Sequence, residues 1–215
     1  MKIKSYEQLM TKSMKGKLLL VCLCLWLSTV AFGQPKPKIP GEMARVLIRT
    51  ELGNIEIEVN AKAAPVTVAN FLRYVDAGHY DGGRFHRTVK LNPDNQPNNT
   101  VKIEVIQAGA DPDKEKSDFP AIKLERTNAT GLLHKNGVIS MARSGPDTAT
   151  SDFFICIGDQ PELDFGGTRN ADGQGFAAFG KVVKGMDVVK KIQHSAAEGQ
   201  NLKPPIKIIK AKRLD

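Results

Sequence analysis

The chain has 215 residues, of which 41% are hydrophobic and 25% are charged, close to average globular usage. This composition excludes a wholly disordered chain, and the length is sufficient for one domain with a real core. The formal net charge is +8, but residues 1–33 contain five lysines and one glutamate, so the remainder has +4. The remaining basic residues form no stripe interleaved with aromatics, and we expect no nucleic-acid partner.

The first 33 residues have the pattern of a signal peptide. Three lysines precede an apolar run at residues 18–32, which is too short to span a bilayer comfortably. The small residues that end the run predict cleavage between Gly33 and Gln34, whichever of the first methionine and Met14 is the start. We therefore expect an exported protein, periplasmic or secreted, with no stable membrane span in its mature form. An uncleaved membrane anchor is the alternative.

The mature chain is expected to begin with an extended leader. Residues 34–43 are polar and rich in proline, and a single domain is predicted over residues 44–215. Of the three cysteines, only Cys156 lies in that domain, so neither an internal disulfide nor a cysteine-based zinc site is available to it. Cys156 lies in an apolar, strand-like run and is expected to be buried and unreactive.

Hydrophobic periodicity predicts many short strands and few helices. Residues 46–48 and the alternating residues 55–59 predict a β-hairpin with one solvated face. Pro65, followed by apolar residues at helical spacing as far as Gly78, predicts a helix. Further strands are predicted at 85–89, 103–107, 137–142, 152–157, 177–183 and 206–214, with a second helix at 186–194. About eight strands and two helices fit an all-β barrel capped by helices, because a barrel leaves no exposed sheet edge.

Five segments carry a more specific signal: Phe85-His86-Arg87, Ile106-Gln107-Ala108-Gly109, residues 137–142, residues 151–155 and Phe179-Gly180-Lys181-Val182. In these residues and their order, from about Ala44 to the C-terminus, the chain resembles the cyclophilins, which are peptidyl-prolyl cis-trans isomerases. The resemblance implies a closed eight-stranded antiparallel barrel with two capping helices. It implies proline-containing polypeptides as partners, with no cofactor and no metal, and we expect a monomer.

The resemblance also implies a set of site residues. Arg87 corresponds to the family's catalytic arginine, which faces the prolyl nitrogen, and Gln107 to the glutamine that helps to hold it and contacts the peptide backbone. An arginine suits this role because it stays charged and offers rigidly placed donors. Strand alternation places Phe154 on the opposite face from its neighbours, towards the groove. The other substrate-binding residues implied are Val105, Ala142, Arg143, Leu163 and Phe176, of which Ala142 and Arg143 contribute their backbone.

Several positions depart from the family's usual residues. Glu104 and Val105 stand where phenylalanine and methionine are common, so we expect a smaller slot wall and a carboxylate near Arg87. Glu162 stands where many eukaryotic members have a tryptophan, which predicts weak binding of cyclosporin. His86 is interpreted as a satisfied core histidine, because prolyl isomerisation transfers no proton in its key step.

The expected function is prolyl isomerisation in unfolded or flexible polypeptides, assisting folding outside the cytoplasm. The alternative is a proline-peptide-binding or chaperone module on the same fold, with little turnover because Glu104 neutralises Arg87 or Val105 slackens the slot. The loops at residues 91–100 and 161–175 resemble those of bacterial members. The physiological substrate and the preferred residue before proline stay open at this point.

Overall fold

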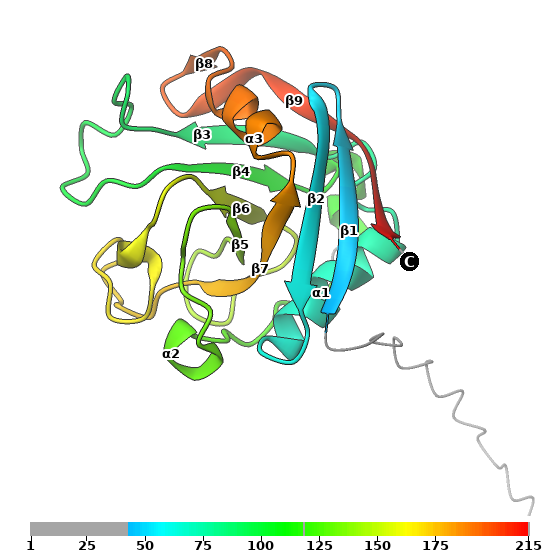
Figure 1. Ribbon diagram of the computed structural model, residues 1–215, viewed down its shortest axis with the longest axis horizontal. Helices are drawn as coiled ribbons and strands as arrows, with labels where there is room; N and C mark the ends of the chain where they lie inside the picture. Colours follow the sequence, from blue (N-terminus) through cyan, green and yellow to red (C-terminus); the bar gives the residue numbers. More distant parts are fainter. Residues whose placement is uncertain (1–42, 118, 215) are drawn as a thin grey trace, which may run out of the picture. The chain divides into compact units, whose positions relative to one another are not determined.

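The computed structural model describes residues 43–117 and 119–214 (Figure 1). Eight strands form one antiparallel sheet in the order β1-β2-β7-β5-β6-β4-β3-β9, and pairing of β1 with β9 closes it into a barrel. A ninth strand, β8 (Ala197–Glu198), adds to β9 only. The barrel strands are β1 (Met43–Thr50), β2 (Gly53–Asn60), β3 (Arg84–Val89), β4 (Val105–Gly109), β5 (Val138–Met141), β6 (Phe153–Cys156), β7 (Ala177–Lys184) and β9 (Asn201–Leu214). The predicted all-β barrel is confirmed.

The β1–β2 hairpin shows how the alternating pattern builds the wall. Ile48 pairs with Ile55 and Val46 with Ile57, and all four side chains are fully buried in the barrel. The intervening glutamates of β2 point outward; one of them, Glu56, lies 3.0 Å from Lys184 of β7. The register is therefore fixed by burial, because a slip of one residue would exchange the two faces.

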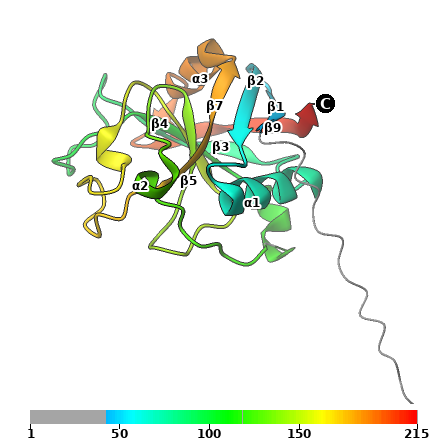
Figure 2. The same ribbon diagram turned by 60° about the horizontal axis from the view of Figure 1, so that its bottom comes forward.

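Helices α1 (Pro65–Asp76) and α3 (Met186–Gln193) lie at opposite ends of the β1–β2 hairpin (Figure 2). Both helices were predicted. The N-terminus of α1 is capped by a residue that is distant in the sequence. The Glu125 carboxylate accepts hydrogen bonds from the backbone of Val66 (3.1 Å) and Thr67 (2.8 Å). An anion at this end also complements the helix dipole. A third, four-residue helix, α2 (Thr127–Thr130), was not predicted.

Two clusters of apolar side chains lie on the two faces of β6. Phe153 and Ile155 belong to the barrel core, where Phe153 meets Phe71 edge to face with ring centroids 5.7 Å apart. Phe154 and Cys156 belong to a second, smaller cluster outside the barrel. The predicted alternation of β6 is therefore correct, and it gives the barrel an apolar outer face.

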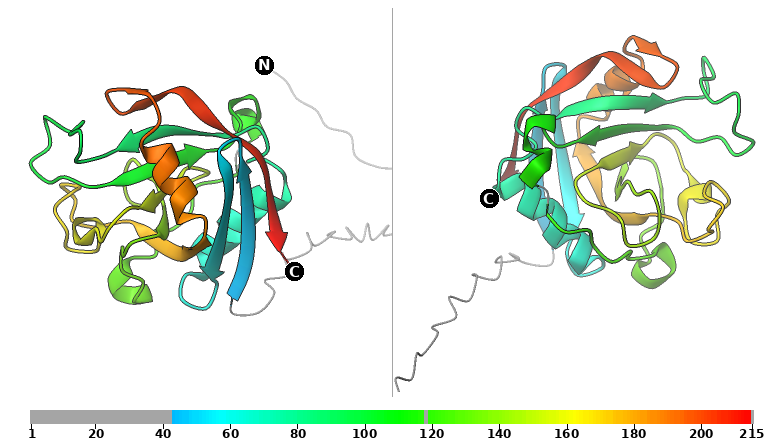
Figure 3. Two further views of the ribbon diagram at one scale, coloured as in Figure 1. Left: turned by 45° about the horizontal axis from the view of Figure 1, so that its top comes forward. Right: turned by 180° about the vertical axis from the view of Figure 1, so that it is seen from behind.

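Some predicted boundaries were wrong. β9 begins at Asn201 and not at residue 206, because it continues through Pro204 and Pro205 (Figure 3). β4 begins at Val105, two residues later than predicted. The predicted signal peptide and leader lie outside the described residues, except for Met43, the first residue of β1. No helix in the described part of the chain is long and apolar enough to cross a membrane.

Candidate functional site

A pocket of about 370 Å³ opens over the outer faces of β3, β4 and β6. It lies where the second apolar cluster meets the loops that precede β4 and β7. All eight predicted site residues line it, so the structure brings together segments from across the domain. The full lining is Arg87, Asn99, Ile103, Val105, Gln107, Ala142, Arg143, Phe154, Leu163, Arg169, Asn170 and Phe176.

The half-buried guanidinium of Arg87 is held from two sides. Its Nη1 donates to Gln107 Oε1 (3.0 Å), on the paired residue of β4, which confirms the predicted contact. Its Nε and Nη2 both donate to Gln200 Oε1, at 2.9 and 2.6 Å. Burial, and next the positive charge of Arg169, lower the pKa of Arg87. An arginine still stays protonated at neutral pH, so the pocket contains a fixed cation whose acceptors are neutral amides.

The amide of Gln107 is oriented by Asp152. Its Nε2 donates to Asp152 Oδ2 (3.0 Å), which leaves Oε1 facing Arg87. Gly109 leaves room for this carboxylate, since a Cβ there would lie 2.1 Å from Asp152 Oδ1. His86 Nε2 lies 3.6 Å from the same Oδ2, and the His86 side chain is 36% exposed. The interpretation of His86 as a core histidine was therefore wrong: it lies at the surface beside the Asp152 carboxylate.

An apolar slot lies beside the cation. Phe154, Leu163 and Val105 are at most 5% exposed. Phe176 meets Phe154 edge to face, with ring centroids 5.3 Å apart. The slot combines two aromatic walls with small aliphatic ones, which suits a compact saturated ring. Phe176, one of the implied substrate-binding residues, is thus an aromatic wall of the pocket.

A buried polar group supports the back of the slot, and sequence reasoning missed it. The His134 ring stacks on Phe154, with an interplanar angle of 15°. Its Nδ1 lies 2.7 Å from Asp164 Oδ1 and its Nε2 lies 2.9 Å from Ser140 Oγ. A neutral imidazole satisfies both contacts by donating from one nitrogen and accepting at the other. Ser140 is fully buried, so this group supports the Phe154 wall and is closed to substrate.

Arg143 contributes its side chain as well as its backbone. Its guanidinium forms a bidentate pair with Asp172, at 2.7 and 2.9 Å, and donates to the carbonyl of Gly175. It also lies over the Phe176 ring, 5.0 Å from the centroid. The pair lowers the pKa of Asp172 to about 2. Arg143 thereby fastens the loop before β7 against the slot, a role that the backbone-only prediction did not include.

The expected carboxylate near Arg87 is not there. Glu104 accepts hydrogen bonds from the backbone of Leu91 (3.3 Å) and from Gln193 Nε2 (3.1 Å). Within the described residues it makes no contact with Arg87. The cause is strand alternation: Val105 and Gln107 face the pocket, so Glu104 faces the other side of the sheet.

Among the described residues, no three His, Cys, Asp or Glu side chains are grouped so that they could hold a metal ion. Cys156 is fully buried in β6, and burial raises the pKa of its thiol. The groups that the pocket brings together are one cation, an oriented amide and a slot for an apolar ring.

Comparisons with known proteins agree with this geometry. A family model described as cyclophilin type peptidyl-prolyl cis-trans isomerase/CLD matches residues 45–213. The chain is 41% identical over 170 residues to a peptidyl-prolyl cis-trans isomerase of Acinetobacter baylyi, covering 76% of this chain and 82% of that one. It is 37% identical over 150 residues to peptidyl-prolyl cis-trans isomerase B of Escherichia coli, covering 69% and 83%.

The fold has a counterpart among solved structures. A crystal structure of a cyclophilin type peptidyl-prolyl cis-trans isomerase from Cryptosporidium parvum matches with a TM-score of 0.64 and 22% identity, over 80% of this chain and 98% of that one. That likeness supports the closed barrel, and the family match spans every strand that lines the pocket. With relatives of about 40% identity over most of its length, the chain belongs to the cyclophilin-type peptidyl-prolyl cis-trans isomerases and is an enzyme of that class.

Proposed function

We propose that this isomerase uses Arg87 as its catalytic cation and acts on X-Pro bonds of unfolded or flexible polypeptides outside the cytoplasm. The observation that carries the catalytic part is the position of the Arg87 guanidinium. It is held by Gln107 and Gln200 at the edge of an apolar slot, in a pocket of about 370 Å³. A proline ring in that slot places the prolyl amide beside the cation.

The chemistry explains why a cation is needed. Rotation about a peptide bond is opposed by about 18–20 kcal/mol, because the nitrogen lone pair is delocalised into the carbonyl. In the twisted amide the lone pair is localised on nitrogen, where a guanidinium stabilises it. Binding the twisted form about 7 kcal/mol better than the planar forms corresponds to roughly 10⁵-fold acceleration. No proton or covalent intermediate is required.

The slot residues supply binding and orientation. Phe154, Leu163, Phe176 and Val105 enclose the proline ring, and the Phe154 wall is held from behind by His134. Removing apolar surface from water contributes about 25 cal/mol per Å², so the ring itself anchors the substrate. The backbone of Ala142 and Arg143 then pairs with the extended peptide.

The rival function is a proline-peptide-binding module with little turnover. It requires either that Glu104 neutralises Arg87 or that Val105 leaves the slot too loose. The contacts of Glu104 with Leu91 and Gln193 argue against the first cause. The burial of Val105, 2% exposed in one cluster with Phe154, argues against the second. The enzyme is therefore the favoured reading of the site.

Isomerase activity is tested by magnetisation-exchange NMR of a short Ala-Pro peptide, with the protein in catalytic amount. Uncatalysed exchange takes tens to hundreds of seconds, so acceleration is readily measured. Wild-type protein is expected to bring exchange into the sub-second range. Peptide binding with no acceleration would favour the module instead.

Export is the part of the proposal that rests on sequence alone. Residues 1–33 carry the signal-peptide pattern, three lysines followed by a short apolar run at residues 18–32. The test is the intact mass of the protein recovered from the periplasm or medium of a bacterial host. A chain beginning at Gln34 supports the proposal, and a chain retained in the membrane with residues 1–33 attached contradicts it.

A further inference from the structure

A second guanidinium, from Arg169, lines the same pocket. Its Nη1 donates to Gln96 Oε1 (3.1 Å) and to the carbonyl oxygen of Val101, which ties the loop before β7 to the loop before β4. Its Nε and Nη2 have no hydrogen-bond partner within the described residues. Arg169 is half-buried, and this burial lowers its pKa. A cation with two unused donors therefore faces a partly enclosed space.

The two arginines Arg87 and Arg169 repel each other. The charge of Arg169 contributes to the lowered pKa of Arg87, after burial. The acceptors of both side chains are amide or backbone carbonyl oxygens, which carry no net charge. In the described part of the chain neither guanidinium is paired with a carboxylate.

Other charged groups around the pocket do not neutralise the positive charges of Arg87 and Arg169. Arg143 is the third arginine of the pocket, and Asp172 pairs with it in bidentate geometry. Asp152 accepts a hydrogen bond from the amide of Gln107, and Glu104 lies on the other side of β4, where Gln193 contacts it. The pocket thus keeps an excess of positive charge, and a partly buried charge is screened less by salt than an exposed one.

We propose that Arg169 makes this isomerase prefer proline segments that carry an acidic side chain, aspartate or glutamate, directly before or after the proline. A carboxylate fits because a guanidinium offers donors in a rigid, planar fork. The substrate carboxylate would accept from the unused Nε and Nη2 and offset the repulsion from Arg87. The inference rests on the proposed role of this pocket in binding the prolyl segment, and it names the substrate class.

A purely structural role for Arg169 makes a different prediction. If Arg169 only ties two loops together, its replacement would lower turnover of all peptides equally. If it binds a substrate carboxylate, its replacement changes the ratio between acidic and neutral peptides. The ratio is therefore the readout, and it does not depend on how well a variant holds the loops.

The experiment compares kcat/KM of the full chain for matched peptides with Glu or Gln directly before proline, and a second pair with Glu or Gln directly after it. At low ionic strength we expect kcat/KM to be two- to five-fold higher for the Glu peptide in one of the two pairs. This ratio corresponds to the free energy of one half-exposed ion pair. The preference should shrink at high salt. Arg169→Gln should abolish it, and Arg169→Lys should retain only part of it, because lysine keeps the charge without the planar fork.

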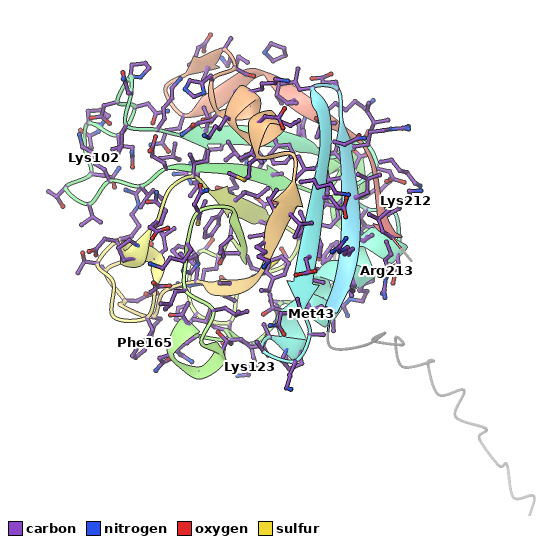
Figure 4. All side chains as sticks on the ribbon, viewed as in Figure 1. Met43, Lys102, Lys123, Phe165, Lys212 and Arg213 are labelled. Atoms are coloured by element: carbon purple, nitrogen blue, oxygen red, sulfur yellow. The ribbon has the colours of Figure 1, made fainter. Side chains whose placement is uncertain are left out.

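Lys212→Gln is the matched control, because it removes the same charge from the exposed end of β9. Lys212 lies on the opposite side of the molecule from Lys102, which neighbours the pocket-lining Ile103 (Figure 4). This variant should keep the full preference. Equal kcat/KM for Glu and Gln peptides at both positions, or a preference unchanged in Arg169→Gln, would overturn the inference. Failure to accelerate any peptide would instead refute the proposed function itself.

Discussion

Replacing Gln200 with leucine should slow turnover by about ten-fold. Gln200 Oε1 accepts two of the three contacts that hold the Arg87 guanidinium, at 2.9 and 2.6 Å, while Gln107 accepts the third. A hydrogen bond to a charged group is worth about 1.5–3 kcal/mol when buried. Because Arg87 is only half-buried, water replaces part of each bond. We expect the less well oriented cation to stabilise the transition state by about 1–2 kcal/mol less, which is roughly ten-fold in kcat/KM.

Gln200→Glu separates orientation from charge. The glutamate keeps an oxygen acceptor for Arg87 but loses the Nε2 donor that Gln200 gives to the carbonyl oxygen of Asn95 (3.1 Å). Arg87 should therefore stay in position, with at most a small fall in the midpoint of thermal unfolding. Turnover should nevertheless decrease, because a carboxylate partly neutralises the cation that faces the prolyl nitrogen. The assay is peptide exchange by NMR, with unfolding followed by circular dichroism. Wild-type kcat/KM in a stably folded Gln200→Leu protein would refute the reasoning.

Three further predictions concern groups around the pocket. Since burial raises the pKa of the Cys156 thiol, a thiol reagent at pH 8 should label Cys156 only after unfolding, as mapped by mass spectrometry; rapid labelling of the native protein would contradict this. Asp172 has a folded pKa of about 2, below its unfolded value, so its pairing stabilises the protein above about pH 4 and is lost towards pH 2. In Asp172→Asn the free energy of unfolding, measured by urea titration, should therefore fall less between those pH values than in wild type. An equal fall in both proteins would count against the pairing. Glu104→Gln should leave turnover within about two-fold of wild type, because Glu104 contacts Leu91 and Gln193; a larger rise would favour the rival module.

The fold was largely predictable because its strands alternate strongly. The β1–β2 hairpin and the two faces of β6 follow directly from which side chains are apolar. The start of β9 was missed because Pro204 and Pro205 ordinarily argue against a strand. Here β9 pairs with β3 at residues 206–207 and again at 201, and the prolines lie between these paired stretches. A proline there breaks no hydrogen bond to β3, which only the three-dimensional pairing shows.

The site residues were predictable only where they lie within a sequence motif of the family. Arg87 and Gln107 lie on paired strands, and their contact follows from the register. Gln200 is 113 residues from Arg87, and no local pattern links the two. The contact of Arg169 with Gln96 likewise joins two loops whose conformations periodicity does not determine. The position of Glu104 was predicted wrongly. Successive side chains of a strand face opposite sides of the sheet, and this rule was used to place Phe154 but was not applied to the residues around β4.

The most direct test is the Arg87→Ala variant, compared with wild type and with Arg87→Lys. Exchange of an Ala-Pro peptide and its binding affinity are both measured. If Arg87 stabilises the twisted amide, Arg87→Ala should lose about 10²- to 10³-fold in turnover, the range for removal of an electrostatic stabiliser, while the peptide affinity changes only a few-fold. Arg87→Lys should recover part of the turnover, because it keeps the charge without the planar fork. Turnover near the wild-type value in Arg87→Ala would contradict the assignment of Arg87 as the catalytic cation.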